Sequence, residues 1–386
     1  MSSHFIPNYV PMIAGNEKNY LSECIETGWL SSVGPFVDKF ERGFADFHGM
    51  KAACAVSSGT AAIHLGLLAL GVMPGDCVLC PSLTFIGSVN PITYCGAEPV
   101  FIDIDKTTLN MDMSVLDDFF SQETVQKRAE GTFYNGKKIA AVIAVHLYGN
   151  PADMDALMEL SRTYHVPVLE DAAESLGALY KGKRVGTIGD IGVFSFNGNK
   201  VITSGGGGMI LSPDSEKVRE CKHLSTQAKS DAIDFIHDKI GFNYRLSNLC
   251  AAVGCAQMEK LEDFIEKKIT LALAYKELSE KSTCIEIVDE PPDCRGTYWM
   301  VLARTKQDLM FPIKDFIKEI HASGCGIRPV WYPIRHMDMY KNNMFFGPGS
   351  DDEAYGSTFC LPSSASLTQD DAQRVISTIE NFFKET

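Results

Sequence analysis

Residues 166–174 read Val-Pro-Val-Leu-Glu-Asp-Ala-Ala-Glu, and this stretch decides the fold class. Val166–Leu169 is a short apolar run, typical of a strand buried on both faces of a parallel sheet. Glu170, Asp171 and Glu174 follow it, so we expect carboxylates at the C-terminal end of a strand, where open α/β sheets bind ligands. A buried carboxylate there requires a cationic or hydrogen-bonding partner, and capping of the following helix is the alternative interpretation.

Short β-prone runs alternate with helical stretches on both sides of this strand. The runs are Ala52–Val56, Cys77–Cys80, Pro99–Ile102, Ile139–Val145, Val166–Leu169, Ile191–Phe196 and Gly207–Leu211. Helical apolar spacing is found over Thr60–Leu70, Asp153–Tyr164 and Asp214–Lys222. The alternation predicts an α/β domain with a mainly parallel sheet and helices on both faces.

The rest of the chain predicts a second, smaller unit. One long helical region over 246–281 precedes a strand-like Tyr298–Ala303 and helices over Ile313–Ala322 and Asp370–Phe383. A chain of 386 residues exceeds the size at which a single core grows efficiently. We therefore expect a large domain over 1–250, including the N-terminal segment, and a small C-terminal α+β domain over 251–386.

Charge and composition exclude several classes of protein. Lys and Arg number 35 against 49 Asp and Glu, so the net charge of −14 disfavours nucleic acid as a partner. No apolar run is long enough for a membrane span, and the first residues lack the features of a signal peptide, so we expect a cytoplasmic protein. The 12 cysteines indicate reduced thiols, and Cys77 and Cys80 indicate strand packing rather than a metal site.

Two further segments carry chemistry. Ser57-Ser58-Gly59-Thr60-Ala61-Ala62 lies between a strand and a helix, and the N–H groups of residues 59–61 would form an anion site; ordinary N-capping by Ser58 or Thr60 is the alternative. Lys200 ends the run that begins at Asp190 and precedes four glycines at 205–208, which allow close approach to a flat ligand. The order of anion turn, Asp171 and Lys200 supplies what pyridoxal phosphate requires: a phosphate cradle, a carboxylate for the ring nitrogen and an amine.

The sequence resembles the DegT-type sugar-nucleotide aminotransferases, which have the aspartate aminotransferase fold (pyridoxal phosphate fold type I). The resemblance runs from Thr27 to Ser364, and its motifs are Phe-Ser-Phe-Asn-Gly-Asn-Lys at 194–200, Leu-Ser-Thr-Gln-Ala-Lys at 224–229, Gly-Phe-Asn-Tyr-Arg-Leu-Ser-Asn at 241–248 and Arg-Pro-Val-Trp at 328–331. Within the family it is most similar to enzymes that aminate UDP-2-acetamido-4-keto-6-deoxyhexoses in the bacillosamine and legionaminic acid pathways.

The resemblance implies a role for each site residue. Lys200 binds the cofactor covalently, Asp171 pairs with the pyridine nitrogen, Glu174 lies near the phenolic oxygen, Phe85 stacks on the ring, and Gly59, Thr60, Ala61 and Ser195 hold the phosphate. Asn243 reaches the phosphate in a neighbouring subunit and Arg245 a substrate anion there, so a homodimer with shared sites is implied; Arg328 and Trp29 are implied to bind substrate. Two positions depart from the pattern: Glu174 replaces a frequent Gln, and Arg335, beside His336, replaces a His.

The implied activity is transfer of an amino group, from L-glutamate, to the 4-keto carbon of a UDP-2-acetamido-2,6-dideoxy-4-keto-hexose. The product would be a UDP-4-amino sugar for surface glycan (lipopolysaccharide) biosynthesis. Amination at C3 of a 3-keto sugar nucleotide stays open. A dehydratase of this fold is disfavoured because such family members replace the lysine that Lys200 matches. A non-catalytic homologue is disfavoured because the cofactor residues are all present.

Overall fold

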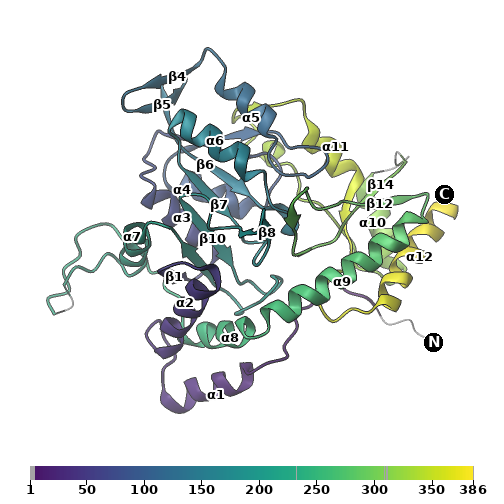
Figure 1. Ribbon diagram of the computed structural model, residues 1–386, viewed down its shortest axis with the longest axis horizontal. Helices are drawn as coiled ribbons and strands as arrows, with labels where there is room; N and C mark the ends of the chain where they lie inside the picture. The colour runs from purple at the N-terminus through teal and green to yellow at the C-terminus, as the bar shows by residue number, and fades with distance from the viewer. Residues whose placement is uncertain (1–4, 232, 308, 310–311, 386) are drawn as a thin grey trace.

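A mainly parallel sheet forms the centre of the protein (Figure 1). The computed structural model describes residues 5–231, 233–307, 309 and 312–385. The strands are β1 (Ala53–Val56), β2 (Cys77–Pro81), β3 (Glu98–Ile102), β6 (Lys137–Val145), β7 (Val168–Asp171), β10 (Ile191–Ser195), β11 (Gly208–Leu211) and β16 (Phe345–Phe346), in the order β1-β11-β10-β7-β6-β2-β3-β16. Only β11 runs antiparallel to its neighbours among these described strands. The expected α/β fold is confirmed.

Five helices of the large unit begin at side chains that cap them. Ser58, Asp112, Asp153, Asp214 and Ser247 each accept a backbone N–H of the helix that follows. The helices are α1 (Glu17–Thr27), α2 (Pro35–His48), α3 (Gly59–Ala69), α4 (Asn90–Tyr94), α5 (Met113–Phe120), α6 (Met154–Tyr164), α7 (Ser215–Ser225) and α8 (Asn248–Met258), with short 3₁₀ turns η1 (Ile86–Ser88), η2 (Leu147–Gly149) and η3 (Ile334–His336). None of the described helices could cross a membrane.

A second, antiparallel sheet has the order β12-β14-β17-β15. Its strands are β12 (Ile285–Ile287), β14 (Leu302–Thr305), β15 (Arg328–Pro329) and β17 (Thr358–Cys360), and α9 (Leu261–Glu280), α10 (Ile313–Ala322), α11 (Ser350–Ser357) and α12 (Gln369–Glu385) accompany it. The remaining strands are β4 (Val125–Arg128), β5 (Gly131–Tyr134), β8 (Leu179–Tyr180), β9 (Lys183–Arg184) and β13 (Cys294–Arg295).

Two elements of this part differ from the sequence prediction. The single helix expected over 246–281 is two helices, because α8 packs against α1 and α2 while α9 continues toward the second sheet. The strand expected over Tyr298–Ala303 begins only at Leu302. Tyr298 has a φ of 47°, and the N–H of Val301 donates to Ser363 Oγ (2.8 Å) instead of joining a ladder.

Helix α9 contributes to both hydrophobic cores. Leu261 and Phe264 of its first turns belong to the large core, whereas Leu271 and Tyr275 belong to the core beneath the second sheet. The two cores therefore meet along one helix. The division into domains after residue 250 stays a prediction.

The N-terminal segment ties the two units together. Asn8 Nδ2 donates to the carbonyls of Cys360 (3.2 Å) and Leu361 (3.3 Å), and the N–H of Val10 donates to Ser364 Oγ (2.7 Å). Between them, Tyr9 OH donates to the carbonyl of Lys200 (2.5 Å) in the large unit. Residues 360–364 thus fix the segment on either side of Tyr9, and Tyr9 holds the loop that carries Lys200.

Candidate functional site

A cavity of about 360 Å³ lies where β7 and β10 end and α3 begins. Seven of the expected site residues line it: Gly59, Thr60, Phe85, Asp171, Glu174, Ser195 and Lys200. They come from five separate segments between residues 59 and 200. The carboxyl edge of the sheet therefore gathers the residues that the sequence placed after its strands.

One end of the cavity has the features of an anion site. Gly59 and Thr60 are the first two residues of α3, so their N–H groups have no partner within the helix. A Cβ on Gly59 would lie 2.9 Å from Ser195 Cβ, so only glycine allows this approach. Ala61 lies outside the cavity lining, and its N–H donates to Ser58 Oγ (3.1 Å). The capping interpretation thus applies to Ala61, while residues 59 and 60 face the cavity.

Asp171 is the last residue of β7 and is almost fully buried at the cavity wall. Its Oδ2 accepts the Ser88 hydroxyl (2.7 Å), and its Oδ1 accepts the N–H of Ala173 (3.1 Å). Burial raises the pKa of Asp171, and these two hydrogen bonds oppose that change only in part. A cationic partner in the cavity would lower the cost of burying this carboxylate.

The adjacent carboxylate of Glu170 has a structural role. It points away from the cavity lining and contacts His146 Nε2 (3.0 Å) and the N–H groups of Gly186 (2.7 Å) and Ile188 (2.6 Å). Burial alone would raise its pKa, but His146 and the backbone donors hold the pKa below the ordinary value. Successive residues on a strand point to opposite sides, which separates the roles of Glu170 and Asp171.

Lys200 and Glu174 face each other across 3.8 Å, from Nζ to Oε1. Burial lowers the pKa of Lys200, although Glu174 and Asp171 oppose that change. Burial raises the pKa of Glu174 to about 7, although Lys200 and the N–H of Tyr148, which donates to Oε2 (2.7 Å), oppose it. Both shifts favour uncharged forms, so this pair is suited to exchange a proton near neutral pH.

Two aromatic rings to which sequence reasoning gave no role, Trp299 and Trp331, form part of the cavity wall, and Tyr148 packs against both from outside the lining. Trp299 lies 4.1 Å from Lys200 Nζ, and Tyr148 is nearly parallel to Trp299 (9°) and Trp331 (15°). Trp331 contacts Phe85, with ring centroids 5.0 Å apart. Trp331 falls within the Arg328–Trp331 motif and could have been chosen, but no local pattern marks Trp299, Tyr148 or Ser88.

Besides Ala61, four expected residues do not line this cavity. Asn243 is exposed and Arg245 partly exposed on the segment between α7 and α8, and Arg328 is exposed on β15. Trp29 is exposed, and its carbonyl accepts Asn248 Nδ2 (2.8 Å). Their roles toward cofactor or substrate stay predictions.

Arg335 and His336, which depart from the family pattern, have partners outside the cavity. The Arg335 guanidinium binds Asp351 at two positions (Nε to Oδ2 3.0 Å, Nη2 to Oδ1 2.9 Å) and also contacts Asp352. His336 Nε2 lies 2.8 Å from Asp352 Oδ1. These ion pairs fasten η3 to the first turn of α11.

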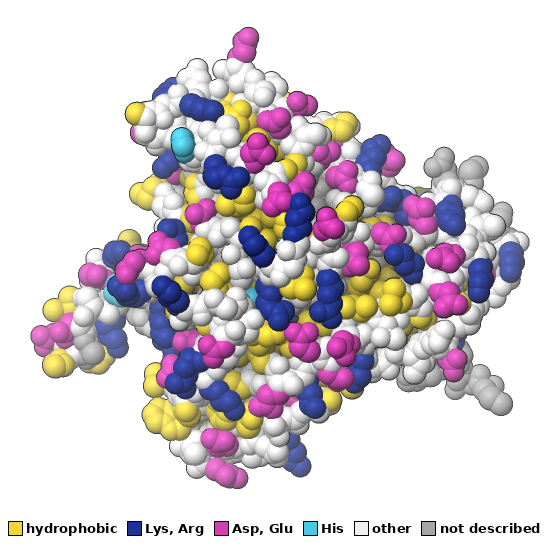
Figure 2. Space-filling model, viewed as in Figure 1, with side chains coloured by type: hydrophobic (Ala, Val, Ile, Leu, Met, Phe, Trp, Pro, Cys, Tyr) yellow, Lys and Arg dark blue, Asp and Glu magenta, His cyan; other side chains and the backbone are white. Residues whose placement is uncertain are grey.

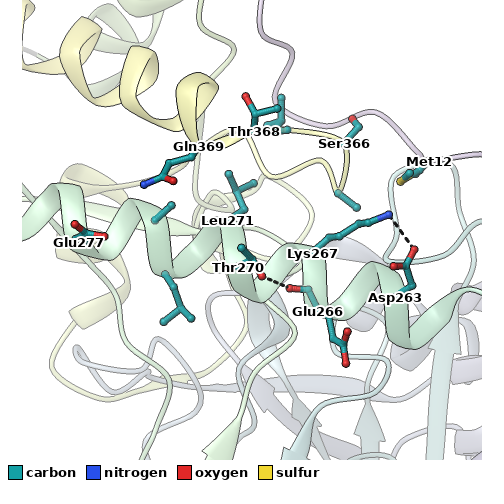
Figure 3. Close-up of a pocket in the computed structure, with 14 residues that line it drawn as sticks. Met12, Asp263, Glu266, Lys267, Thr270, Leu271, Glu277, Ser366, Thr368 and Gln369 are labelled. Atoms are coloured by element: carbon teal, nitrogen blue, oxygen red, sulfur yellow. Dashed lines mark hydrogen bonds and ion pairs between the residues drawn. The ribbon is translucent and has the colours of Figure 1, made fainter.

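A larger groove, of about 750 Å³, lies between α9 and residues 365–369 (Figure 3). Its charged side chains are Asp263, Glu266, Lys267 and Glu277, and Lys267 Nζ pairs with Asp263 Oδ2 at 2.9 Å. Neither an anion cradle nor a buried charge occurs among its lining residues. We therefore place the chemistry in the smaller cavity.

The smaller cavity combines an anion cradle, a buried carboxylate and a buried lysine at the edge of a mainly parallel sheet. Gly59 makes room for an anion beside Ser195, and no cation of the described residues forms an ion pair with Asp171, a place that a protonated ring nitrogen would fill. The residues thus fit pyridoxal 5′-phosphate, and the fold and site define an enzyme of fold type I that uses this cofactor.

Comparison with known proteins identifies the family. The chain belongs to the DegT/DnrJ/EryC1/StrS aminotransferase family, whose model matches residues 11–380. It is therefore a pyridoxal phosphate-dependent sugar aminotransferase. Among solved structures, the aminotransferase TlmJ from Streptoalloteichus hindustanus is 26% identical with a TM-score of 0.88, over 98% of this chain and 99% of that chain.

Two curated relatives bear on the sugar. GDP-perosamine synthase of Escherichia coli O157:H7 is 39% identical over 99% of both chains, and GDP-perosamine synthase of Caulobacter vibrioides is 37% identical over 96% of both. These names correct the expected nearest resemblance to bacillosamine and legionaminic acid enzymes, because they point to GDP-linked rather than UDP-linked sugars. The motifs around the cofactor identify the family, but they do not indicate which nucleotide the sugar carries.

Proposed function

We propose that this enzyme transfers an amino group from L-glutamate to the 4-keto carbon of a nucleotide-linked 4-keto-6-deoxyhexose, giving a 4-amino sugar nucleotide for glycan synthesis. The observation that carries the proposal is Lys200 in one cavity with Asp171 and the turn at 59–60. The names of the relatives support a sugar as the acceptor. Amination at C3 is the alternative, because the ketone position depends on how the sugar sits in the pocket.

GDP is the favoured nucleotide, because the relatives at 39% and 37% identity are both named GDP-perosamine synthase. The UDP-2-acetamido sugar suggested by the sequence motifs is the second candidate. No described residue of the cavity marks a guanine or a uracil site, so the choice is left to measurement.

Some residues of the cavity would bind the cofactor, and others would transfer protons. Gly59, Thr60 and Ser195 would hold the phosphate of pyridoxal phosphate, and Asp171 would hold its ring nitrogen in the protonated form. When bound, this cofactor supplies a carbonyl carbon that carries the amino group and a ring that accepts electrons.

Lys200 is the group that moves the proton. Because burial lowers the pKa of its amine, Lys200 releases a proton at neutral pH more readily than an exposed lysine does. Glu174, 3.8 Å away, would receive or return that proton, and the Trp299 ring excludes water from the other side of the amine. The protein side of the reaction is thus an acid–base pair fixed in an apolar wall.

The test is the second half-reaction alone. The protein is loaded with pyridoxamine phosphate and mixed with 4-keto-6-deoxy sugars linked to GDP or UDP, and the absorbance of the pyridoxal form is followed. We expect the GDP sugar to restore that absorbance, with a Lys200→Ala variant as the inactive control. If only the UDP-2-acetamido sugar restored the absorbance, the nucleotide would be UDP rather than GDP. If neither sugar restored it, the proposal would be overturned.

We propose also that the active form is a homodimer with shared sites. The segment between α7 and α8 carries a loop that projects from the body, and Ile233, Phe235 and Ile240 on this loop are more than half exposed (Figures 1 and 2). Exposed apolar clusters of this kind mark contact surfaces. Asn243 and Arg245 lie on the same segment, and within the described residues Arg245 Nε is buried without a hydrogen-bond partner.

Mixing two inactive variants tests the shared site. A Lys200→Ala chain lends an intact Asn243 and Arg245, and an Arg245→Ala chain keeps an intact lysine. Random exchange makes about half of the dimers mixed, each with one complete site, so roughly one quarter of wild-type activity should return. No recovery, with exchange confirmed by tagged subunits, would place Arg245 in the site of its own chain or outside any site.

A further inference from the structure

A second buried lysine, Lys268 on α9, lies behind the wall of the cavity. Its side chain is 1% exposed, and its Nζ donates to the carbonyls of Trp299 (3.2 Å) and Ser363. The Nζ also lies 4.9 Å from the centre of the Tyr9 ring. In the described part of the chain no carboxylate pairs with it. Burial of an amine without a counterion is costly, and it lowers the pKa of Lys268 to about 7.

The two aromatic residues that contact Lys268 hold the loop of the catalytic lysine. Tyr9 OH donates to the carbonyl of Lys200 (2.5 Å), and Trp299 Nε1 donates to the carbonyl of Asn199. Lys268 therefore contacts both residues, Tyr9 and Trp299, whose side chains donate the hydrogen bonds that fix the backbone of residues 199 and 200. No other described lysine has such a position.

Trp299 also sets the surroundings of the reactive amine. Its ring lies 4.1 Å from Lys200 Nζ, and its backbone carbonyl is the group that Lys268 binds. Ser363, the other acceptor, donates its hydroxyl to the carbonyl of Leu361 and accepts the N–H of Val301, two residues from Trp299. Removal of Lys268 would thus remove the hydrogen bond that holds the backbone carbonyl of Trp299.

We propose that Lys268 is a positioning residue for Lys200, which acts through Trp299 and Tyr9 to keep the Lys200 amine fixed against an apolar wall. The proposal rests on the proposed role of Lys200 as the group that moves the proton. Lys268 touches neither the cavity nor the groove, since it is absent from the lining of both.

The neighbouring residue supplies a matched control. Lys267 lies on the same helix but faces the groove, where it is 42% exposed and pairs with Asp263 (Figure 3). Lys268→Met and Lys267→Met each remove one amine and keep a similar stem. Only the first change removes a group that contacts Trp299.

The experiment measures the amine of Lys200 in the full-length protein before cofactor is added. Reductive methylation over a range of pH, read at Lys200 by mass spectrometry, gives the pH midpoint of its reactivity. In Lys268→Met we expect this midpoint to rise by about one unit toward that of an exposed lysine, a tenfold change in unprotonated amine at fixed pH. Lys267→Met should match the wild type. A folded Lys268→Met protein with an unchanged midpoint would overturn the proposal.

A second variant keeps the test decisive if Lys268→Met fails to fold. Tyr9→Phe removes only the hydroxyl that binds the carbonyl of Lys200, and it should raise the same midpoint by a smaller amount. An unchanged midpoint in Tyr9→Phe would then overturn the proposal. The sugar assay separates the two proposals: a raised midpoint without sugar amination defeats only the proposed function, and sugar amination with unchanged midpoints defeats only the role of Lys268.

Discussion

The cavity at the edge of the sheet and the groove beside α9 differ in more than size. The groove is about 750 Å³ and the cavity about 360 Å³. In the groove, the ion pair of Lys267 and Asp263 is about half exposed, whereas the side chains of Lys200 and Glu174 in the cavity are 11% and 4% exposed. Buried charge with too few partners, rather than volume, identifies the site.

The energetic cost explains this difference. An exposed pair one helical turn apart contributes only about 0.3–0.5 kcal/mol, so it can occur on any helix surface. A buried charge costs several kcal/mol unless it is well paired. Asp171, Glu174 and Lys200 therefore weaken the protein without its cofactor, and a bound cofactor offsets that cost.

Lys200→Ala should have the largest effect. Loss of the amine removes both covalent attachment and proton transfer, so turnover should fall by more than about 10³-fold while the fold and the anion cradle stay intact. Steady-state assays and thermal melting measure the two effects. Borohydride reduction of the wild type should fix the cofactor on Lys200, and recovery of the label on another lysine would contradict the assignment.

Asp171→Asn should have the next largest effect. An amide does not hold the ring nitrogen protonated, so the rate should fall roughly 10²- to 10⁴-fold. Asp263→Asn in the groove is the matched control and should leave the rate unchanged. An Asp171→Asn rate within a few-fold of the wild type would mean that Asp171 serves the protein only through Ser88 and Ala173.

Glu174→Gln should change how stability depends on pH. Burial raises the pKa of Glu174 from 4.5 to about 7, so this residue destabilises the cofactor-free fold progressively as pH rises through that window. The glutamine variant does not titrate, so its loss should be smaller. Between pH 4.5 and pH 7, the free energy of unfolding of the wild type should fall by on the order of 3 kcal/mol relative to that of the variant. Urea unfolding at both pH values measures the difference, and parallel pH curves would contradict it.

Neutralising the groove should have the smallest effect. Glu266→Gln combined with Glu277→Gln removes two of its charges, and we expect activity within two-fold and stability within about 0.5 kcal/mol of the wild type. Turnover and urea unfolding measure both quantities. A large loss of activity would mean that the groove takes part in function and that the comparison with the cavity is wrong.

Much of the fold followed from local pattern. Strand β6 contains the apolar run Ile139–Val145, and β7 overlaps the predicted Val166–Leu169 but extends to Asp171. Helices such as α3 and α6 start at capping side chains, so the places of these elements were predicted within a few residues. The order of the anion turn, Asp171 and Lys200 identified the cavity because parallel strands end at one edge. The break between α8 and α9 escaped prediction because it depends on packing against α1 and α2.

The residues that escaped prediction act through contacts distant in sequence. Trp299 reaches Lys200 only because the chain turns at Tyr298, and Ser88 reaches Asp171 across 83 residues. Lys268 is one of two adjacent lysines on α9. Its helical spacing from Phe264 and Leu271 places it on the apolar face, but an isolated lysine on such a face carries no signal of a functional role. The nucleotide stays undecided between GDP and UDP because the motifs that identify the family surround the cofactor, not the sugar nucleotide.

The N-terminal segment gives this enzyme an unusual order of assembly. Asn8 and Val10 bind Cys360, Leu361 and Ser364, so these two residues wait during synthesis for partners that lie 352 to 354 residues further along the chain. Contacts of such long separation form late and slow folding. A nascent chain with β7 and β10 in place would hold the cavity residues yet leave Tyr9, and with it the backbone of Lys200, unsecured. The hydrogen bond from Tyr9 to the carbonyl of Lys200 is thus secured only after synthesis has passed residue 364.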